Sequence, residues 1–183
     1  MSRLVFPFVL LFLSLSCLAE ELPPAVHEIV PTLESWGGDP VLIAAVKDQN
    51  AQGMSLESIQ TRDAEWRKVE GLDDAMRAMM SSPAAKKLIE FEQSEPYFFE
   101  LFLMDNQGAN VAMTNKTSDY WQGDEAKWQK SFSDGKGAVH IGDVEFDESA
   151  QDYLVQISVP VVEGGQVLGA LTVGINLDDL EGN

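Results

Sequence analysis

The segment Thr117–Trp128, TSDYWQGDEAKW, combines three aromatic rings, three acids and one lysine within twelve residues. Such a mixture suits a small polar ligand, because aromatic faces supply apolar contact area and fixed charges orient the bound molecule. The composition therefore predicts that this segment forms part of a binding pocket. A surface loop with amphipathic residues is the alternative interpretation.

Nine side chains are candidates for contacting this ligand. Aromatic rings would form walls, acids would accept hydrogen bonds from an ammonium group, and a lysine would hold a carboxylate. The candidates are Asp119, Tyr120, Trp121, Asp124, Lys127, Trp128, Asp147, Ser149 and Tyr153. Within this set, Tyr120 and Trp121 are the favoured ligand walls.

Three of the charged candidates have structural roles that compete with ligand binding. An acid at a helix start accepts hydrogen bonds from free backbone N–H groups, so Asp119 or Asp124 could cap the helix expected over 122–132, and the sequence favours this cap for Asp124. Lys127 is equally suited to an exposed i,i+3 ion pair with Asp124. All three residues therefore keep two interpretations.

Four other candidates also keep two interpretations. Trp128 is as well suited to the hydrophobic core as to a pocket wall. Asp147 and Ser149 are as well suited to a turn with an Asx-type hydrogen bond as to ligand binding. Periodicity alone leaves the direction of the Tyr153 side chain open.

The chain shows no residue pattern that indicates catalysis. It has two histidines, His27 and His140, and neither a Gly-x-Ser-x-Gly nor a His-Glu-x-x-His motif. Acid pairs are common in so acidic a chain, and they leave a two-carboxylate hydrolase as an alternative. We expect neither enzymatic activity nor a cofactor or metal. A calcium site among the acids of Asp143–Glu148 is a weaker alternative.

Residues 1–19 have the pattern of a signal peptide. Arg3 precedes an apolar run, Leu4–Leu15, and Ala19 ends a small-x-small cleavage site. The run is shorter than the roughly 20 residues of a membrane-spanning helix. We expect cleavage after Ala19 and export to the periplasm or another external compartment. A lipid anchor at Cys17 is a less favoured alternative.

The chain is strongly acidic, with 12 Lys and Arg against 30 Asp and Glu and a net charge of −18. Because residues 1–19 contain one arginine and no acid, the mature chain keeps 11 bases and 30 acids, a net charge of −19. Like charges repel, so nucleic acids and anionic lipid surfaces are excluded as partners. The acidity indicates high solubility.

The mature sequence predicts helices followed by an antiparallel sheet. Apolar residues at helical spacing over 24–95 indicate a long, broken N-terminal helix and shorter helices after it. From Tyr97 the pattern changes to two short strands around a turn at 105–108, a helix over 122–132 and three further strands. We expect an α+β domain whose five-stranded antiparallel sheet, within 97–180, carries helices on one face.

This order of elements resembles the extracytoplasmic PAS-like sensor domains of the Cache or PDC type, in their single-module form, over residues 24–180. The likeness rests on a hairpin, Phe99–Thr114 (FELFLMDNQGANVAMT), on Thr117–Trp128, on FDES at Phe146–Ser149, and on the final strands with ISVPV at Ile157–Val161 and VLGALTVGINL at Val167–Leu177. It implies a pocket over the sheet, roofed by the segment between the second and third strands, which is 116–137 here.

The resemblance also implies a function and partners. Such domains bind small molecules, often amino acids, amines or carboxylates, and typically drive a histidine kinase or a chemoreceptor. The chain ends at Asn183 without a second span or an output domain, so we expect a single exported sensor domain, 20–183, that signals in trans to a membrane sensor kinase or chemoreceptor. The alternative is an envelope protein–protein interaction module with a vestigial pocket. A homodimer through the N-terminal helix is left open.

Overall fold

The computed structural model describes residues 22–147 and 152–182. In chain order the elements are α1 (Pro24–Gly37), α2 (Pro40–Asn50), α3 (Leu56–Trp66), α4 (Asp74–Ser81), α5 (Pro83–Glu92), β1 (Phe98–Met104), β2 (Asn110–Met113), α6 (Ala126–Phe132), a 3-10 turn (Ser133–Gly135), β3 (His140–Asp147), β4 (Asp152–Glu163), β5 (Gln166–Asn176) and α7 (Leu177–Glu181). None of the helices in these ranges is long and apolar enough to cross a membrane. The expected signal peptide, 1–19, lies outside the described residues.

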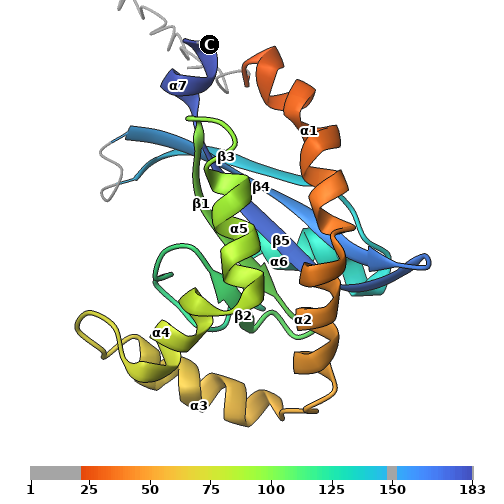
Figure 1. The fold of residues 1–183 in the computed structure, drawn as a ribbon, viewed down its shortest axis with the longest axis vertical. Coiled ribbons are helices and arrows are strands. Elements are labelled where there is room, and N and C mark those ends of the chain that lie inside the picture. Colours follow the sequence, from red (N-terminus) through yellow and green to blue (C-terminus); the bar gives the residue numbers. More distant parts are fainter. Residues whose placement is uncertain (1–21, 148–151, 183) are drawn as a thin grey trace, which may run out of the picture.

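Five strands in the described part of the chain form one antiparallel sheet with the order β2-β1-β5-β4-β3 (Figure 1). The long β4–β5 hairpin turns at Gly164 and Gly165, both of which have the positive φ that glycine adopts without a steric penalty. The α+β class and the antiparallel sheet predicted from the sequence are therefore confirmed.

The predicted long N-terminal helix is divided into α1 and α2. Asp39 ends the break and caps α2, because its Oδ1 accepts a hydrogen bond of 2.7 Å from the backbone N–H of Val41. At the end of α1, a Cβ atom on Gly37 would collide with the backbone carbonyl oxygen of Pro160 in β4. Because Gly37 has no side chain, the end of α1 can pack directly against the backbone of β4.

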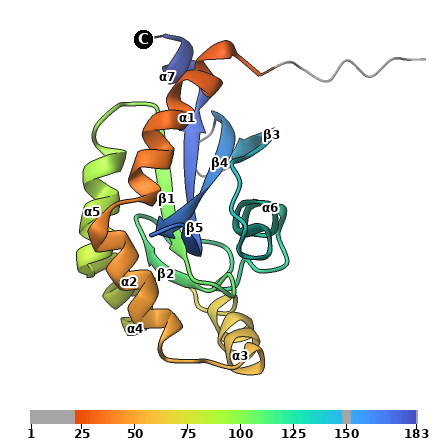
Figure 2. The ribbon, with the colours of Figure 1, turned by 90° about the vertical axis from the view of Figure 1, so that its right-hand side faces the viewer.

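One face of the sheet is covered by α1, α2 and α5 (Figure 2). Because side chains alternate along a strand, β1, β4 and β5 each send one apolar row towards these helices. The buried cluster includes Leu33, Leu42, Leu88, Ile157 and Val173. On this side the indole of Trp36 also stacks on the ring of Phe91, with 4.3 Å between centroids. We call this cluster the first core.

The opposite face of the sheet carries a second core and, beside it, α6 (Figure 2). Side chains of α3 and α4, among them Ile59, Trp66 and Met76, pack against Phe102 and Met104 of β1. Met76 and Met79 are buried there. The sheet is thus a wall shared by two apolar clusters, and α6 lies over the part of the second face that is made by β3, β4 and β5.

Candidate functional site

A cleft of about 320 Å³ opens between α6 and the strands β3 and β4. The helix α6 lies on the face of the sheet opposite α1 (Figure 2). The volume of the cleft lies at the lower end of the range of small-molecule pockets, which is roughly 300 to 1,000 Å³. The polar lining side chains are Glu125, Lys127, Lys130, His140, Asp143, Glu145 and Gln156. Ala126, Ile141, Gly142, Phe146 and Leu154 complete the lining. The cleft therefore combines an apolar surface with charges of both signs.

The floor of the cleft is polar because of the alternation along β4. Val155 and Ile157 point into the first core, which directs Gln156 to the opposite face, where it lines the cleft. On the same face the hydroxyl of Ser158 is buried and hydrogen-bonded to the hydroxyl of Thr172, 2.8 Å away. Polar groups on this row indicate that it is not simply another core surface.

The α6 wall of the cleft carries two lysines one turn apart, Lys127 and Lys130. The Lys127 Nζ atom is 2.9 Å from an oxygen of Glu125 and 5.4 Å from the ring centroid of Phe102. The two lysines therefore give this wall positive charge. Ser131, next to Lys130, is fully buried, and its Oγ has no hydrogen-bond partner among the described residues.

The β3 wall carries acids, Asp143 and Glu145, together with His140. Burial lowers the pKa of His140 below its ordinary value of about 6.5, and the nearby Lys130 lowers it further, while Asp143 opposes both effects. The imidazole is therefore neutral at pH 7. A molecule with one anionic and one cationic group matches the two walls, because each group can face a charge of opposite sign.

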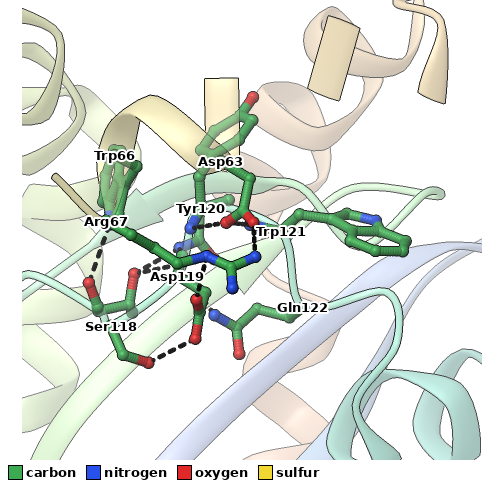
Figure 3. Close-up of polar contacts among 10 residues, drawn as sticks. Asp63, Trp66, Arg67, Ser118, Asp119, Tyr120, Trp121 and Gln122 are labelled. Atoms are coloured by element: carbon green, nitrogen blue, oxygen red, sulfur yellow. Dashed lines mark hydrogen bonds and ion pairs between the residues drawn. The ribbon is translucent and has the colours of Figure 1, made fainter. Parts of the chain in front are cut away.

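The chain segment that leads into α6 is fixed to α3 by a buried carboxylate (Figure 3). The Oδ1 atom of Asp63 accepts hydrogen bonds from the backbone N–H groups of Tyr120 (2.9 Å) and Trp121 (3.1 Å). Its Oδ2 atom pairs with Arg67, whose Nε atom is 2.8 Å from Asp119 Oδ1. This network holds the 119–121 backbone in place, which positions the start of the α6 wall.

Three indoles support the same segment through their N–H groups. The Nε1 atoms donate to backbone carbonyl oxygens: Trp66 to Thr117 (2.9 Å), Trp121 to Gln107 (2.7 Å) and Trp128 to Asp105 (3.0 Å). Each indole is thus used to join segments that are distant in the sequence. Trp121 and Trp128 pack against the second core and do not line the cleft.

Tyr120 is fully buried in the second core. The guanidinium of Arg62 lies 4.2 Å from the centroid of its ring and donates a hydrogen bond of 3.4 Å to its hydroxyl. Burial raises the pKa of this hydroxyl, and the charge of Arg62 opposes that shift. The structure therefore places Tyr120 beneath the loop and outside the cleft.

The three charged candidates of Thr117–Trp128 lie in three different environments. Lys127 lines the cleft, whereas Asp119 is paired with Arg67 and Asp124 is exposed. The expected cap by Asp124 is wrong, because α6 begins at Ala126 and its N-cap residue is Glu125, without a side-chain cap bond. The lysine pairs with Glu125 and not with Asp124.

The expected helix over 122–132 starts late for a physical reason. The backbone N–H of Gln122 donates to the carbonyl of Gly108 (2.8 Å), and Trp121 forms an isolated bridge with Ala109. This short stretch is therefore committed to the β1–β2 turn before α6 can begin.

The candidates from the β3–β4 hairpin lie at its far end. Asp147 is the last residue of β3, and Ser149 lies outside the described residues. The Tyr153 side chain is exposed, and its ring makes an edge contact with Phe146, with 5.4 Å between centroids. Phe146 lines the cleft, whereas Tyr153 does not.

Lys127 is the one ligand candidate among the residues that line the cleft. The polar lining residues missed as ligand candidates are Glu125, Lys130, His140, Asp143, Glu145 and Gln156. For Lys130 and Gln156 a signal is present in the sequence. Lys130 follows Lys127 at i+3, the spacing that places two side chains on one side of a helix. Gln156 lies on the mixed face of an alternating strand, which is the face that a ligand rather than the core would occupy.

A second hollow, of about 400 Å³, lies beside α3 and is lined mainly by helical side chains. Two of them are already used inside the protein, since Arg62 packs on Tyr120 and Trp66 donates to Thr117. It therefore offers fewer groups to a ligand than the cleft beneath α6.

An antiparallel sheet of this strand order, with helices packed on one face and a polar cleft beneath a helix on the other, defines the class of PAS-like sensor domains. The chain belongs to the family of methyl-accepting chemotaxis protein-like first PDC sensor domains, whose model matches residues 73–182. The matched range runs from the cap of α4 to α7 and contains every residue that lines the cleft. No curated protein matches the chain.

Several solved structures are similar to the chain in fold. The ligand-binding domain of the Pseudomonas aeruginosa amino acid chemoreceptor PctC, in complex with GABA, is 13% identical, with a TM-score of 0.39 and coverage of 86% of this chain and 63% of that one. The sensory domain of the Campylobacter jejuni chemoreceptor Tlp3 is 12% identical, with a TM-score of 0.44 and coverage of 86% and 64%. The sensor domain of the V. cholerae histidine kinase DctB is 14% identical, with a TM-score of 0.42 and coverage of 85% and 60%. The chain spans slightly less than two thirds of these domains.

Proposed function

We propose that this chain is an exported sensor domain that binds a small zwitterionic molecule in the cleft between α6 and the strands β3 and β4. The ligand would place its anionic group near Lys127 and Lys130 and its cationic group near Asp143 and Glu145. The observation that carries the proposal is the opposition of these charges across a cleft of about 320 Å³. An amino acid satisfies both the charge pattern and the size.

A panel of small molecules tests this proposal by thermal shift and isothermal titration calorimetry. GABA, L-isoleucine and L-serine belong in the panel because chemoreceptor domains of similar fold are in complex with them. A molecule that binds only the native state raises the melting temperature, by RT ln(1 + [L]/Kd) in free energy. No shift and no heat with any zwitterion, amine or carboxylate would contradict the proposal.

Matched lysine variants locate the site. Lys130→Gln removes a charge from the cleft wall and should weaken binding roughly tenfold, which corresponds to one charge-assisted hydrogen bond. Lys136→Gln makes the same change on an exposed residue that follows α6 and does not line the cleft. Equal losses in the two variants would place the ligand elsewhere.

Signalling in trans to a membrane sensor kinase or chemoreceptor is the second part of the proposal. The family match supports the sensor role from which this part of the proposal starts. Purified receptor ectodomains immobilised on a sensor surface should retain the chain more strongly when its ligand is present. Retention that is independent of ligand would favour constitutive association.

Export with removal of residues 1–19 is the third part, and the single domain 20–183 would be the mature form. Intact-mass measurement of the protein from the cell envelope should give a chain beginning at Glu20. A mass increased by acyl chains on Cys17 would instead show a lipid anchor.

An envelope interaction module with a vestigial pocket is the alternative function. The exposed aromatic pair Phe146 and Tyr153 favours it, with exposures of 51% and 55%, because large exposed rings are often used in protein contacts. Replacing both by serine should abolish partner binding under this alternative. Under the ligand-binding proposal the same change would act mainly on the rim of the cleft.

A further inference from the structure

A row of four residues crosses the sheet beneath the cleft: Glu100 on β1, Gly174 on β5, Gln156 on β4 and Gly142 on β3. Gln156 is directly opposite Gly174 in the β4–β5 register. The β1–β5 register gains one residue on β1 between Phe98 and Leu101, so this irregularity contains Glu100. A Cβ atom on Gly174 would lie 2.9 Å from Glu100 Cγ, and one on Gly142 would lie 3.2 Å from the backbone oxygen of Gln156.

The two polar members of this row meet across the central strand. The Gln156 Nε2 atom donates a hydrogen bond of 3.0 Å to Glu100 Oε1. Their strands are second neighbours, roughly 10 Å apart, because adjacent strands are separated by about 4.8 Å. The side chains can meet only over a residue that has no side chain, which is the role of Gly174. Of the two polar side chains in this row, Gln156 is the one that lines the cleft.

The chemistry of this contact sets the orientation of the amide. An ionised carboxylate has acceptors only, whereas a glutamine amide has a donor end and an acceptor end. Glu100 therefore holds the Nε2 end of Gln156 and turns the Oε1 end away from itself. An isolated glutamine could present either end to a ligand, but this one is biased towards presenting its oxygen.

We propose that Glu100 is a positioning residue that makes the cleft select ligands with an N–H donor directed at the sheet floor. The inference rests on the proposed function, since it assigns a direction to the ligand in the same cleft. The carboxylate of a bound zwitterion points to Lys127 and Lys130 on α6. Its ammonium, near Asp143 and Glu145, also donates to the oxygen of Gln156. A ligand that lacks the amino group leaves this oxygen without a partner, which costs affinity.

Pairs of molecules that differ only in the amino group test the inference by calorimetry. The pairs are GABA with butyrate, L-isoleucine with 3-methylpentanoate, and L-serine with 3-hydroxypropanoate. The wild-type protein should prefer the amine-bearing member of a bound pair at least tenfold. Glu100→Gln, which replaces one carboxylate oxygen by a donor, should reduce that preference to about twofold or less. Lys130→Gln should weaken both members by a similar factor, because both contain the carboxylate.

The outcomes separate the inference from the function on which it rests. If the wild-type protein binds none of the six molecules or any other small charged compound, the proposed function fails. If it binds without preferring the amine, or if Glu100→Gln keeps the wild-type preference, the function stands and the assignment of Glu100 is overturned.

A second measurement does not require the Glu100→Gln variant to fold. The side-chain amide resonance of Gln156 in wild-type protein should shift as acid protonates Glu100, because the hydrogen-bond acceptor changes. Assignment of the resonance uses its absence in Gln156→Leu. An amide resonance that does not move through the acid titration would also overturn the assignment.

Discussion

Replacing Asp63 by alanine should destabilise the protein strongly, because one buried carboxylate serves two segments. The residue is only 2% exposed, and its Oδ1 atom is the hydrogen-bond acceptor for the backbone N–H groups of Tyr120 and Trp121. A buried donor left without a partner costs about 1 to 3 kcal/mol. Two such donors give a loss of roughly 2 to 6 kcal/mol. The partner on Oδ2, Arg67, is half exposed and can be solvated by water after the change.

Urea unfolding followed by circular dichroism measures this loss. At about 2 to 4 °C per kcal/mol for a chain of this size, a loss of 4 kcal/mol lowers the melting temperature by roughly 8 to 16 °C. Asp63→Asn keeps an oxygen for the two N–H groups and should lose less than half as much. The control is Asp124→Ala, an exposed acid of the same segment, which should change stability by no more than about 0.5 kcal/mol. A loss below 1 kcal/mol for Asp63→Ala, with an unchanged slope against urea, would refute the reasoning.

Three further predictions concern other parts of the molecule. Gly37→Ala should cost about 1 to 3 kcal/mol in urea unfolding through collision with the carbonyl of Pro160, whereas Gly38→Ala, whose nearest contact would be 3.4 Å, should cost less; equal effects would contradict the packing argument. Because the folded pKa of His140 is lowered, the unfolded chain binds more protons just below pH 6.5, so stability should fall as pH decreases through that range. His140→Asn should reduce this slope in melting experiments, and an unchanged slope would assign it to other groups. Tyr120→Phe should leave ligand affinity within about twofold, since the ring lies outside the cleft, whereas Tyr120→Ala should lose about 3 to 5 kcal/mol of stability; a Phe variant that no longer binds would return Tyr120 to the site.

The fold could be predicted from the sequence where local signals agree with the global arrangement. Asp39 followed by Pro40 marks the start of α2, and the alternation after Asp152 marks β4. The turn at Asp105 also follows from its residue type, because its Oδ1 atom accepts from Gln107 N (2.8 Å) and Ala109 N (3.0 Å). Each of these features depends on residues fewer than five positions apart.

The candidate site was harder to predict because its contacts are not local. The Asp63 carboxylate meets a backbone N–H 57 positions later, and Glu100 meets Gln156 across 56 positions. The composition of Thr117–Trp128 indicated a pocket, but composition does not say which side chains enter the core. Tyr120 is buried in the core, whereas Lys127 lines the cleft from the first turn of α6.

The distribution of indoles gives the two faces of the sheet separate optical reporters. Trp36 stacks on Phe91 in the first core, while Trp66, Trp121 and Trp128 pack in or against the second core. The tryptophan fluorescence of a protein with Trp36→Phe would come only from the side that carries the cleft. This fluorescence would report structural changes on the face that carries α6, and the first core would contribute no tryptophan signal. The same arrangement lets unfolding of the two layers be timed separately, without attaching any dye.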